Sequence, residues 1–407
     1  MNRPYEHFQV IAKPSGSVCN LDCTYCFYLE KERLYPDRKN HWKMDDATLE
    51  VFIRQNIRAG ASEVVDFIWQ GGEPTLMGID YFEKALALQQ RYRGSRHINN
   101  YLQTNGMLLD ETWARFLKKH HFLVGISLDG DRASNDRWRK TRAGKSSFGT
   151  VLAGIRLLKQ HGVAFNTLTV VNAENVRRPL ETYQALKRAG SRYIQFIPLV
   201  ERAANRPGPD GLTLISPDFT GQSEVTPWSV PAQAYGRFLN KIFDHWLLND
   251  TGSVFVMNFE QTLTQLAGGQ GSCVTEPTCG ANPVMEANGD VYSCDHFVYP
   301  QHLLGNLHHS DLGDLINSEQ NIRFGQHKLR HLSQECLRCT FRPLCHGGCP
   351  KHRFERADNG MLNHNYLCAG YKEYLRHCLP SMEIILSLLK SGRSPEKIKR
   401  YFRQHTA

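Results

Sequence analysis

The 407-residue sequence contains no long apolar segment. No stretch approaches the roughly 18 consecutive apolar residues that a membrane-spanning helix needs, and Met1 to Tyr5 do not open an apolar run like that of a signal peptide. Collagen-like repeats and low-complexity tracts are also absent, and a chain with 41% hydrophobic and 22% charged residues is an ordinary globular one. We therefore expect a cytoplasmic protein of two or three domains, at roughly 150 residues each, with no membrane partner.

The chain has little concentrated charge of one sign. Its 49 Lys and Arg against 40 Asp and Glu give a net charge of +9. The basic residues are scattered, except in Arg137 to Arg142 and in the tail from Lys390 to Arg403. Neither stretch is interleaved with aromatic residues, as a groove for single-stranded nucleic acid would be. We predict no nucleic-acid partner and interpret both stretches as solvated surface.

Cysteine is missing from the whole interval between Cys26 and Cys273, although the sequence contains twelve cysteines. Three precede the interval, eight lie between Cys273 and Cys368, and Cys378 stands alone. Disulfides are rare in a reducing cytoplasm. Grouped thiols in such a chain predict metal or iron–sulfur cluster binding.

Strand-like and helix-like segments alternate through the first half of the chain. The strand-like runs are Phe8 to Ala12, Val64 to Trp69, Ile98 to Gln103, Leu123 to Leu128, Phe165 to Val171 and Tyr193 to Leu199. Amphipathic segments between them are Asp45 to Arg58, Tyr81 to Arg91, Glu111 to Lys119, Thr150 to His161 and Pro179 to Ala189. Repeated βα units predict a parallel sheet, as an incomplete barrel or as a doubly wound sheet. Polar turns follow successive strands, at Gly71 to Pro74, Thr104 to Gly106 and Asp129-Gly130, and favour the open barrel, where they share one rim.

Composition divides the whole chain into four parts. We expect a barrel over residues 1–232, a helical connector over 233–270, a cysteine-rich domain over 271–380 and a helical basic tail over 381–407. Proline and glycine are frequent from Glu201 to Ala232, which predicts a connecting loop, either a lid over the substrate or a plain linker.

Cys19, Cys23 and Cys26 form a C-x3-C-x2-C motif after the first predicted strand. Three thiolates can hold a [4Fe-4S] cluster while leaving one iron without a protein ligand. The amino and carboxylate groups of S-adenosylmethionine can bind that iron, and reduction of the sulfonium then yields a 5'-deoxyadenosyl radical. A zinc site and three unrelated core cysteines are the alternatives. The Gly71-Gly72-Glu73-Pro74 turn, which offers backbone and a carboxylate to an ammonium group, favours radical chemistry.

These motifs resemble the signature of radical S-adenosylmethionine enzymes, which implies a partial (β/α)6 barrel. Within that group, Gln70 to Thr75, Gln103 to Gly106 and Gly125 to Gly130 are similar to anaerobic sulfatase-maturating enzymes. The resemblance implies that Ser127 and Arg139 contact the methionine and ribose parts of the cofactor. The other residues expected in the cofactor site are Tyr25, Gly71, Gly72, Glu73, Gln103 and Asn105. Without the resemblance, Ser and Asn at strand ends would be helix caps or turn residues, and Arg139 would be a surface residue.

The eight cysteines of the second group suffice for two clusters of four ligands each. Structural zinc is the alternative for the C-x2-C pair Cys336 and Cys339. The arrangement resembles the SPASM extension of radical enzymes that modify peptides. This implies an inner auxiliary cluster on Cys273, Cys279, Cys294 and Cys349, and an outer one on Cys336, Cys339, Cys345 and Cys368. The chain would then hold three [4Fe-4S] clusters and leave Cys378 unligated.

Asp295 directly follows Cys294, and Asn288 to Asp295 also resembles the sulfatase-maturating family. The resemblance implies that Asp295 is the base, although His296 is a second titratable group beside it. The implied reaction oxidises a Cys or Ser of a sulfatase to Cα-formylglycine. The adenosyl radical takes hydrogen from the β-carbon, the base takes a proton, and the inner auxiliary cluster takes the second electron. An electron donor such as flavodoxin or ferredoxin is then expected.

Three other functions are compatible with these residues. One is a radical enzyme that forms thioether or carbon–carbon cross-links in peptides. The others are a zinc-stabilised interaction protein and a plain electron carrier.

Overall fold

The computed structural model describes residues 5–35, 41–204 and 212–405. Its centre is a ten-stranded sheet with the order β12-β11-β10-β1-β2-β3-β4-β5-β6-β9. The neighbours from β1 to β9 are parallel, which confirms the parallel sheet. These strands are β1 (Ile11–Ala12), β2 (Val64–Trp69), β3 (His97–Thr104), β4 (Leu123–Ser127), β5 (Phe165–Val171), β6 (Tyr193–Pro198) and β9 (Phe255–Val256).

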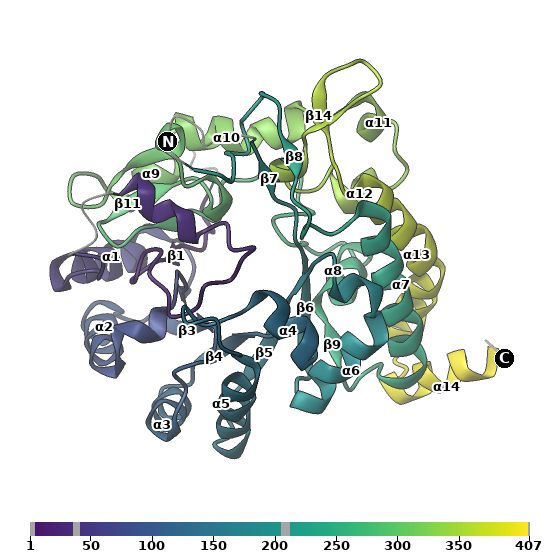
Figure 1. Cartoon of the computed structure of the whole chain (residues 1–407), viewed down its shortest axis with the longest axis horizontal. Coiled ribbons are helices and arrows are strands. Elements are labelled where there is room, and N and C mark those ends of the chain that lie inside the picture. The colour runs from purple at the N-terminus through teal and green to yellow at the C-terminus, as the bar shows by residue number, and fades with distance from the viewer. Residues whose placement is uncertain (1–4, 36–40, 205–211, 406–407) are drawn as a thin grey trace.

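Helices cover the outer side of this curved sheet (Figure 1). They are α1 (Asp46–Ala59), α2 (Ile79–Tyr92), α3 (Glu111–Lys119), α4 (Arg132–Trp138), α5 (Phe148–Gln160) and α6 (Pro179–Ala189). Local sequence fixes their starts: the Asp45 carboxylate accepts from Thr48 N at 2.7 Å and that of Asp110 from Trp113 N at 2.8 Å. Such caps satisfy backbone donors that have no partner inside the helix. The result is the partial barrel that the sequence predicts.

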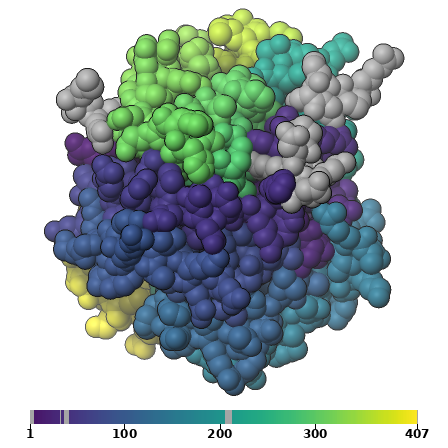
Figure 2. All heavy atoms as spheres, turned by 90° about the vertical axis from the view of Figure 1, so that its left-hand side faces the viewer, coloured from purple at the N-terminus to yellow at the C-terminus, as the bar shows by residue number. Residues whose placement is uncertain are grey.

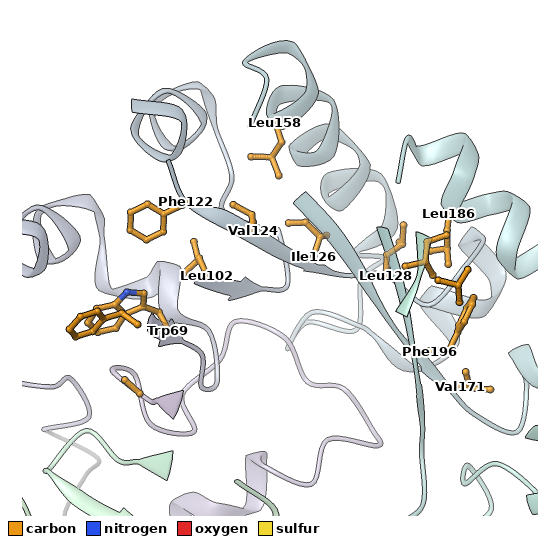
Figure 3. Packing of buried hydrophobic residues seen from close by; sticks show 14 of the residues in the cluster. Trp69, Leu102, Phe122, Val124, Ile126, Leu128, Leu158, Val171, Leu186 and Phe196 are labelled. Atoms are coloured by element: carbon orange, nitrogen blue, oxygen red, sulfur yellow. The ribbon is translucent and has the colours of Figure 1, made fainter. Parts of the chain in front are cut away.

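Alternation along the strands separates the core from the interior of the barrel. Val124 and Ile126 of β4 are buried, and Figure 3 shows them with Leu158 of α5 on their outer side. Successive strand residues point to opposite faces. The intervening Gly125 and Ser127 therefore face the inside of the barrel, where the polar turns converge.

The cysteine-rich segment continues the same sheet. Strand β10 (Val284–Met285) pairs parallel with β1, and β11 (Asp290–Tyr292) and β12 (Leu303–Asn306) follow in antiparallel order. Figure 2 shows this segment in green lying directly on the purple and blue N-terminal part of the chain. The boundary predicted at residue 271 therefore divides the chain but does not divide the sheet.

Short elements make up the rest of the cysteine-rich segment and the loop before it. They are β7 (Arg202–Ala203), β8 (Glu224–Val225), α9 (Leu312–Ile316), α10 (Glu319–Arg330), α11 (Gln334–Leu337), α12 (Arg342–Cys345), β13 (Glu355–Arg356) and β14 (Leu362–His364). The 3-10 turns are Leu29–Leu34, Pro74–Met77, Asn175–Arg177, Asp295–Phe297, Pro300–His302 and Pro350–His352.

Four helices close the side of the molecule beyond β6: α7 (Ala232–Asn249), α8 (Met257–Leu266), α13 (Cys368–Lys390) and α14 (Pro395–His405). The predicted helix from Ser381 to Leu389 is the last part of α13, which continues through Pro380. In the basic tail, Ile398 and Phe402 are buried. The prediction that the tail is solvated surface is therefore wrong for these two side chains. No helix among the described residues is long and apolar enough to cross a membrane.

Candidate active site

The first three cysteines lie in the loop after β1. Cys26 N donates to Cys23 O at 2.9 Å, and Leu21 N lies 3.4 Å from Cys19 Sγ. Burial raises the pKa of Cys23 to about 12 and those of Cys19 and Cys26 to about 11. Binding of iron at these thiols must therefore displace protons.

The basic stretch Arg137 to Arg142 packs on this loop. Asp22 N donates to Lys140 O at 2.8 Å, and Arg142 Nε donates to Cys19 O at 2.8 Å. The prediction of a solvated surface holds for Arg137, Lys140 and Arg142, which are exposed, but it is wrong for Arg139, which is buried.

The Gly71-Gly72-Glu73 turn docks on the same loop through its backbone. Gly72 N donates to Gly16 O at 2.7 Å and Glu73 N to Val18 O at 2.9 Å. A Cβ at Gly72 would lie 2.1 Å from Val18 O, so a side chain does not fit there. The glycine is a requirement of this close approach.

The Glu73 side chain does not extend toward a ligand. It is fully buried, and its carboxylate accepts from Thr104 Oγ1 at 2.6 Å, Thr75 Oγ1 at 2.6 Å and Asn105 N at 2.7 Å. The expected contact between this carboxylate and an ammonium group is therefore not what the geometry favours. Glu73 instead ties together the turns that follow β2 and β3.

The remaining polar residues of the rim come together as predicted. Asn105 Nδ2 donates to Asn20 Oδ1 at 2.7 Å and lies 3.5 Å from Cys19 Sγ. Gln103 Nε2 donates to Ser127 Oγ at 3.1 Å. A Cβ at Gly125 would lie 2.1 Å from Gln103 Oε1, so the glycine makes room for this side chain.

Tyr25 and Arg139 meet Asp129, which was predicted in a polar turn of the rim but not among the cofactor-site residues. Tyr25 Oη donates to Asp129 Oδ2 at 2.5 Å, and Arg139 Nη1 donates to Tyr25 Oη at 2.9 Å. All three side chains are buried. The position of Asp129 in the turn after β4 placed it on the rim, but its contact with Tyr25 is not visible in the sequence. Arg139 is thus an interior residue whose charge is compensated by Asp129.

Asp295 pairs with Lys13, another residue absent from the predicted site. Lys13 Nζ lies 2.7 Å from Asp295 Oδ1, and the lysine side chain is 1% exposed. Burial raises the pKa of Asp295, but the charge of Lys13 and its hydrogen bond act in the opposite direction and the net shift is downward. Burial and Lys351 lower the pKa of His296 to about 3, so its imidazole is neutral and weakly basic. The Asp295 carboxylate is therefore ionised, whereas the imidazole of His296 is neutral.

The structure places the eight later thiols in two groups of four. Electrostatic interactions of Cys349 with Cys273, Cys279 and Cys294 define an inner group. Cys336, Cys339, Cys345 and Cys368 line one small cavity and form an outer group. This is the division that the resemblance implies. Among the described residues, no three His, Cys, Asp or Glu side chains lie close enough to hold a single metal ion.

A cavity of about 420 Å³ lies between the barrel and the cysteine-rich segment. Tyr25, Cys26 and Gln195 line it from the barrel, and His296 and Cys349 line it from the other side. One cavity therefore adjoins the first cysteine loop, the neighbour of Asp295 and the inner thiol group.

The comparisons with known proteins agree with this geometry. Residues 14–186 match the radical SAM superfamily, and residues 279–340 match the SPASM iron–sulfur cluster-binding domain. The serine-type anaerobic sulfatase-maturating enzyme of Bacteroides thetaiotaomicron is 41% identical over 96% of this chain and 94% of that protein. The cysteine-type enzyme of Clostridium perfringens is 33% identical over 94% of this chain and 99% of that protein.

The chain belongs to the anaerobic sulfatase-maturating enzymes. The solved structure of native anSMEcpe with bound AdoMet and Cp18Cys peptide superposes with a TM-score of 0.81, at 32% identity, over 94% of this chain and 99% of that chain. As a radical SAM enzyme with a SPASM domain, this sulfatase-maturating enzyme uses S-adenosylmethionine and several iron–sulfur clusters. The zinc alternatives are thereby set aside.

Unpartnered donors in this sulfatase-maturating enzyme fit a polar cofactor beside the first cysteine loop. Arg139 Nε and the indole Nε1 atoms of Trp138 and Trp228 are buried and have no hydrogen-bond partner among the described residues. Both indoles pack in the apolar cluster that includes Cys23 and Tyr25. Buried donors normally have partners, so a bound molecule with acceptor groups is expected here.

Proposed function

We propose that the protein oxidises a Cys or Ser side chain of a sulfatase polypeptide to Cα-formylglycine. The observation that carries this proposal is the single cavity that adjoins Cys26, His296 and Cys349. A substrate side chain in this cavity lies between the first cysteine loop, His296 beside the proposed base Asp295, and the inner thiol group. That combination is what a two-electron oxidation of a side chain requires.

The cysteines divide into three ligand sets in this proposal. Cys19, Cys23 and Cys26 hold the first cluster, and the inner and outer groups hold one cluster each. When bound, the first cluster and S-adenosylmethionine supply hydrogen-atom abstraction, and the auxiliary clusters accept electrons. The Gly71-Gly72-Glu73 turn contributes its backbone to the cofactor site, and Gln103, Asn105, Ser127 and Arg139 contribute side chains.

Asp295 removes the proton of the substrate thiol or hydroxyl. Its partly buried carboxylate is held at 2.7 Å by the buried Lys13, which keeps it ionised and fixes its direction. The tyrosine, aspartate and arginine triad of Tyr25, Asp129 and Arg139 orients the polar groups of the cofactor. The lining of the cavity limits the access of water to reactive species.

The test is incubation of the reduced, anaerobic enzyme and S-adenosylmethionine with sulfatase peptides that carry Ser or Cys. The Ser peptide should lose two hydrogens and gain a carbonyl that reacts with a hydrazine. The Cys peptide should exchange sulfur and two hydrogens for oxygen. Loss of two hydrogens without a hydrazine-reactive carbonyl would instead support a cross-linking enzyme. Relatives named serine-type are 39–41% identical, whereas those named cysteine-type are 32–33% identical, so we expect the Ser peptide to be accepted.

Asp295→Asn tests the base. We expect this variant to keep its iron and to cleave S-adenosylmethionine but to lose peptide oxidation. The loss should be greater for Ser than for Cys, because a thiol with a pKa of about 8.5 releases its proton far more easily than a hydroxyl. Full turnover of the Ser peptide by Asp295→Asn would refute this role.

The setting of the reaction completes the proposal. We propose a cytoplasmic enzyme that receives electrons from a small carrier such as flavodoxin or ferredoxin. Reduction of the purified enzyme by such a carrier, followed by cleavage of S-adenosylmethionine, measures this directly.

A further inference from the structure

Two cations lie among the thiols of the cysteine-rich segment, Lys328 buried and Arg353 half-buried. The Lys328 side chain is 0% exposed, and its Nζ donates to Cys273 O at 2.7 Å and Val274 O at 2.9 Å. The Arg353 guanidinium donates to the carbonyl oxygens of His346 at 2.7 Å, Gly347 at 3.0 Å and Lys328 at 2.5 Å. Every one of these acceptors is a neutral backbone oxygen.

Neither cation pairs with a carboxylate in the described part of the chain. Lys328 interacts electrostatically with the inner cysteines Cys279, Cys349 and Cys273 and also with the outer Cys345. Arg353 interacts with inner and outer cysteines alike, since Cys336 and Cys345 join Cys349 and Cys279 around it. Lys328 thus belongs mainly to the inner group, and Arg353 lies between the two groups.

Buried charges of this kind need compensation. Removing an ammonium or guanidinium ion from water costs several kcal/mol unless an opposite charge lies nearby. The backbone carbonyls supply only partial charges. A cluster with four thiolate ligands is an anion, and its reduction adds one further negative charge. A nearby cation stabilises the reduced form more than the oxidised form and so raises the reduction potential.

We propose that Lys328 and Arg353 raise the reduction potentials of the auxiliary clusters, so that the inner cluster accepts the electron released by the substrate. The proposal rests on the proposed function only in assigning the inner thiols to a cluster that accepts electrons. In the reaction, the substrate radical loses one electron after losing its hydrogen atom and proton, and the inner cluster gains that electron. Arg353, with thiols of both groups around it, also favours the reduced state of the outer cluster. The difference in reduction potential between the inner and the outer cluster is then smaller, which favours electron transfer between them.

The experiment is a redox titration of the full-length holoenzyme, monitored by electron paramagnetic resonance, without S-adenosylmethionine or peptide. Lys328→Gln removes the charge and keeps an amide donor for the carbonyls of Cys273 and Val274. We expect it to lower the midpoint potential of the inner cluster so that the reduced fraction at a fixed potential falls about tenfold, or about 59 mV for one electron. Arg353→Gln should lower the potentials of both auxiliary clusters. The first cluster is the internal reference, because the thiols that interact with the two cations all belong to the auxiliary groups.

Two further variants distinguish an effect of charge on the midpoint potentials from an effect of altered packing. Arg330→Gln removes a positive charge from an exposed position on the same helix as Lys328, and should leave all midpoints unchanged because water screens that charge. Lys328→Arg keeps the charge and should restore the wild-type midpoint. Iron content is measured for each variant.

Unchanged midpoints in Lys328→Gln and Arg353→Gln at full iron content would overturn the proposal. If Lys328→Gln loses iron, the midpoint potential of the inner cluster in Arg353→Gln becomes the deciding measurement, because Arg353 also interacts with inner thiols. A drop in potential equal to that of Arg330→Gln would likewise refute it. Because no substrate is present, failure of peptide oxidation and failure of this electrostatic effect are separate results.

Discussion

At the scale of single residues, Gly72 allows the Gly71-Gly72-Glu73 turn to pack closely against the loop that carries the first three cysteines. A Cβ added at Gly72 would lie 2.1 Å from Val18 O and 2.6 Å from Ser17 C. Both neighbours are backbone, so neither can move without displacing the loop that carries Cys19. We expect Gly72→Ala to lose iron from the first cluster, about a third of the total for three equal clusters, and to abolish cleavage of S-adenosylmethionine. Iron analysis and nucleoside chromatography measure both effects.

Gly149→Ala is the matched control for that substitution. Gly149 lies in α5, and the nearest atom to an added Cβ is a flexible arginine nitrogen at 3.8 Å. Alanine favours a helix by up to about 1 kcal/mol relative to glycine, so this variant should be neutral or slightly more stable. Equal iron loss in the two variants would contradict the role assigned to Gly72.

A buried carboxyl makes the stability of the protein depend on pH. Burial raises the pKa of Glu286 to about 8, although Lys13 opposes the shift. The Tyr28 hydroxyl donates to Glu286 Oε1 in the fold. From its ordinary pKa of 4.5 up to about 8, the unfolded state has ionised this carboxyl while the folded state keeps it protonated. The unfolded state then binds fewer protons, so stability falls as the pH rises through this window.

Glu286→Gln removes that titration while keeping the shape of the protonated carboxyl. We expect the melting temperature of the variant, relative to that of the wild type, to rise steadily between pH 5 and pH 8 and to level off above this range. Calorimetry of the anaerobic holoenzymes measures the difference. The exposed Glu83 provides a control, since Glu83→Gln should follow the wild-type profile. A constant difference across the window would contradict the buried titration.

At the scale of elements, the crossing of α7 and α13 positions a cluster ligand. The helices approach at Gly236 and Gly370, and a Cβ at Gly370 would lie 2.1 Å from Ala232 O. Helix α13 begins at Cys368, a thiol of the outer group, so a displaced helix also displaces that thiol. We expect Gly370→Ala to lose the outer cluster, about a third of the iron, while S-adenosylmethionine cleavage continues.

The neighbouring exposed residue offers the comparison for Gly370→Ala. Ala369 lies on the exposed side of α13, and Ala369→Ser also adds a single atom there. This variant should retain the iron content of the wild type. Retention of full iron by Gly370→Ala would show that the crossing tolerates a side chain and does not fix Cys368.

The elements that could be predicted are those with a clear period. The strands β2 to β6 and their helices were predictable because alternating and helical apolar patterns persist over five residues or more. Strand β1 was predicted within Phe8 to Ala12, but β10 to β12 have only two to four residues, too few for a period, and were not predicted. Among the residues of the site, too, some were predictable from the sequence and others were not. The cysteines are visible from their spacing, whereas Lys13 pairs with Asp295 and Lys328 contacts carbonyls 55 and 54 residues away.

At the scale of the whole molecule, the barrel depends on the cysteine-rich segment. Strand β1 lies between β2 and β10. Tyr5 Oη donates to Cys279 O at 2.8 Å, and Gln55 Nε2 donates to Leu307 O at 2.9 Å. Lys351 forms a buried ion pair with Glu201. The aromatic side chains of Phe259 and Tyr374 stack between α8 and α13. The two parts therefore share a sheet edge, a core and the cavity.

Residues 1–270 expressed alone should consequently fail to fold. Removal of the remainder exposes the apolar faces of α7 and α8 that α13 covers, and large exposed apolar patches drive aggregation. Expression followed by size-exclusion chromatography and limited proteolysis measures the outcome. A chain ending at residue 390 is the control: it lacks only α14, whose buried side chains are Ile398 and Phe402, and it should stay folded with full iron and a lower melting temperature. A soluble 1–270 fragment that holds the first cluster and cleaves S-adenosylmethionine would contradict this dependence, because the site would then need no contact from the segment that supplies the electron acceptors.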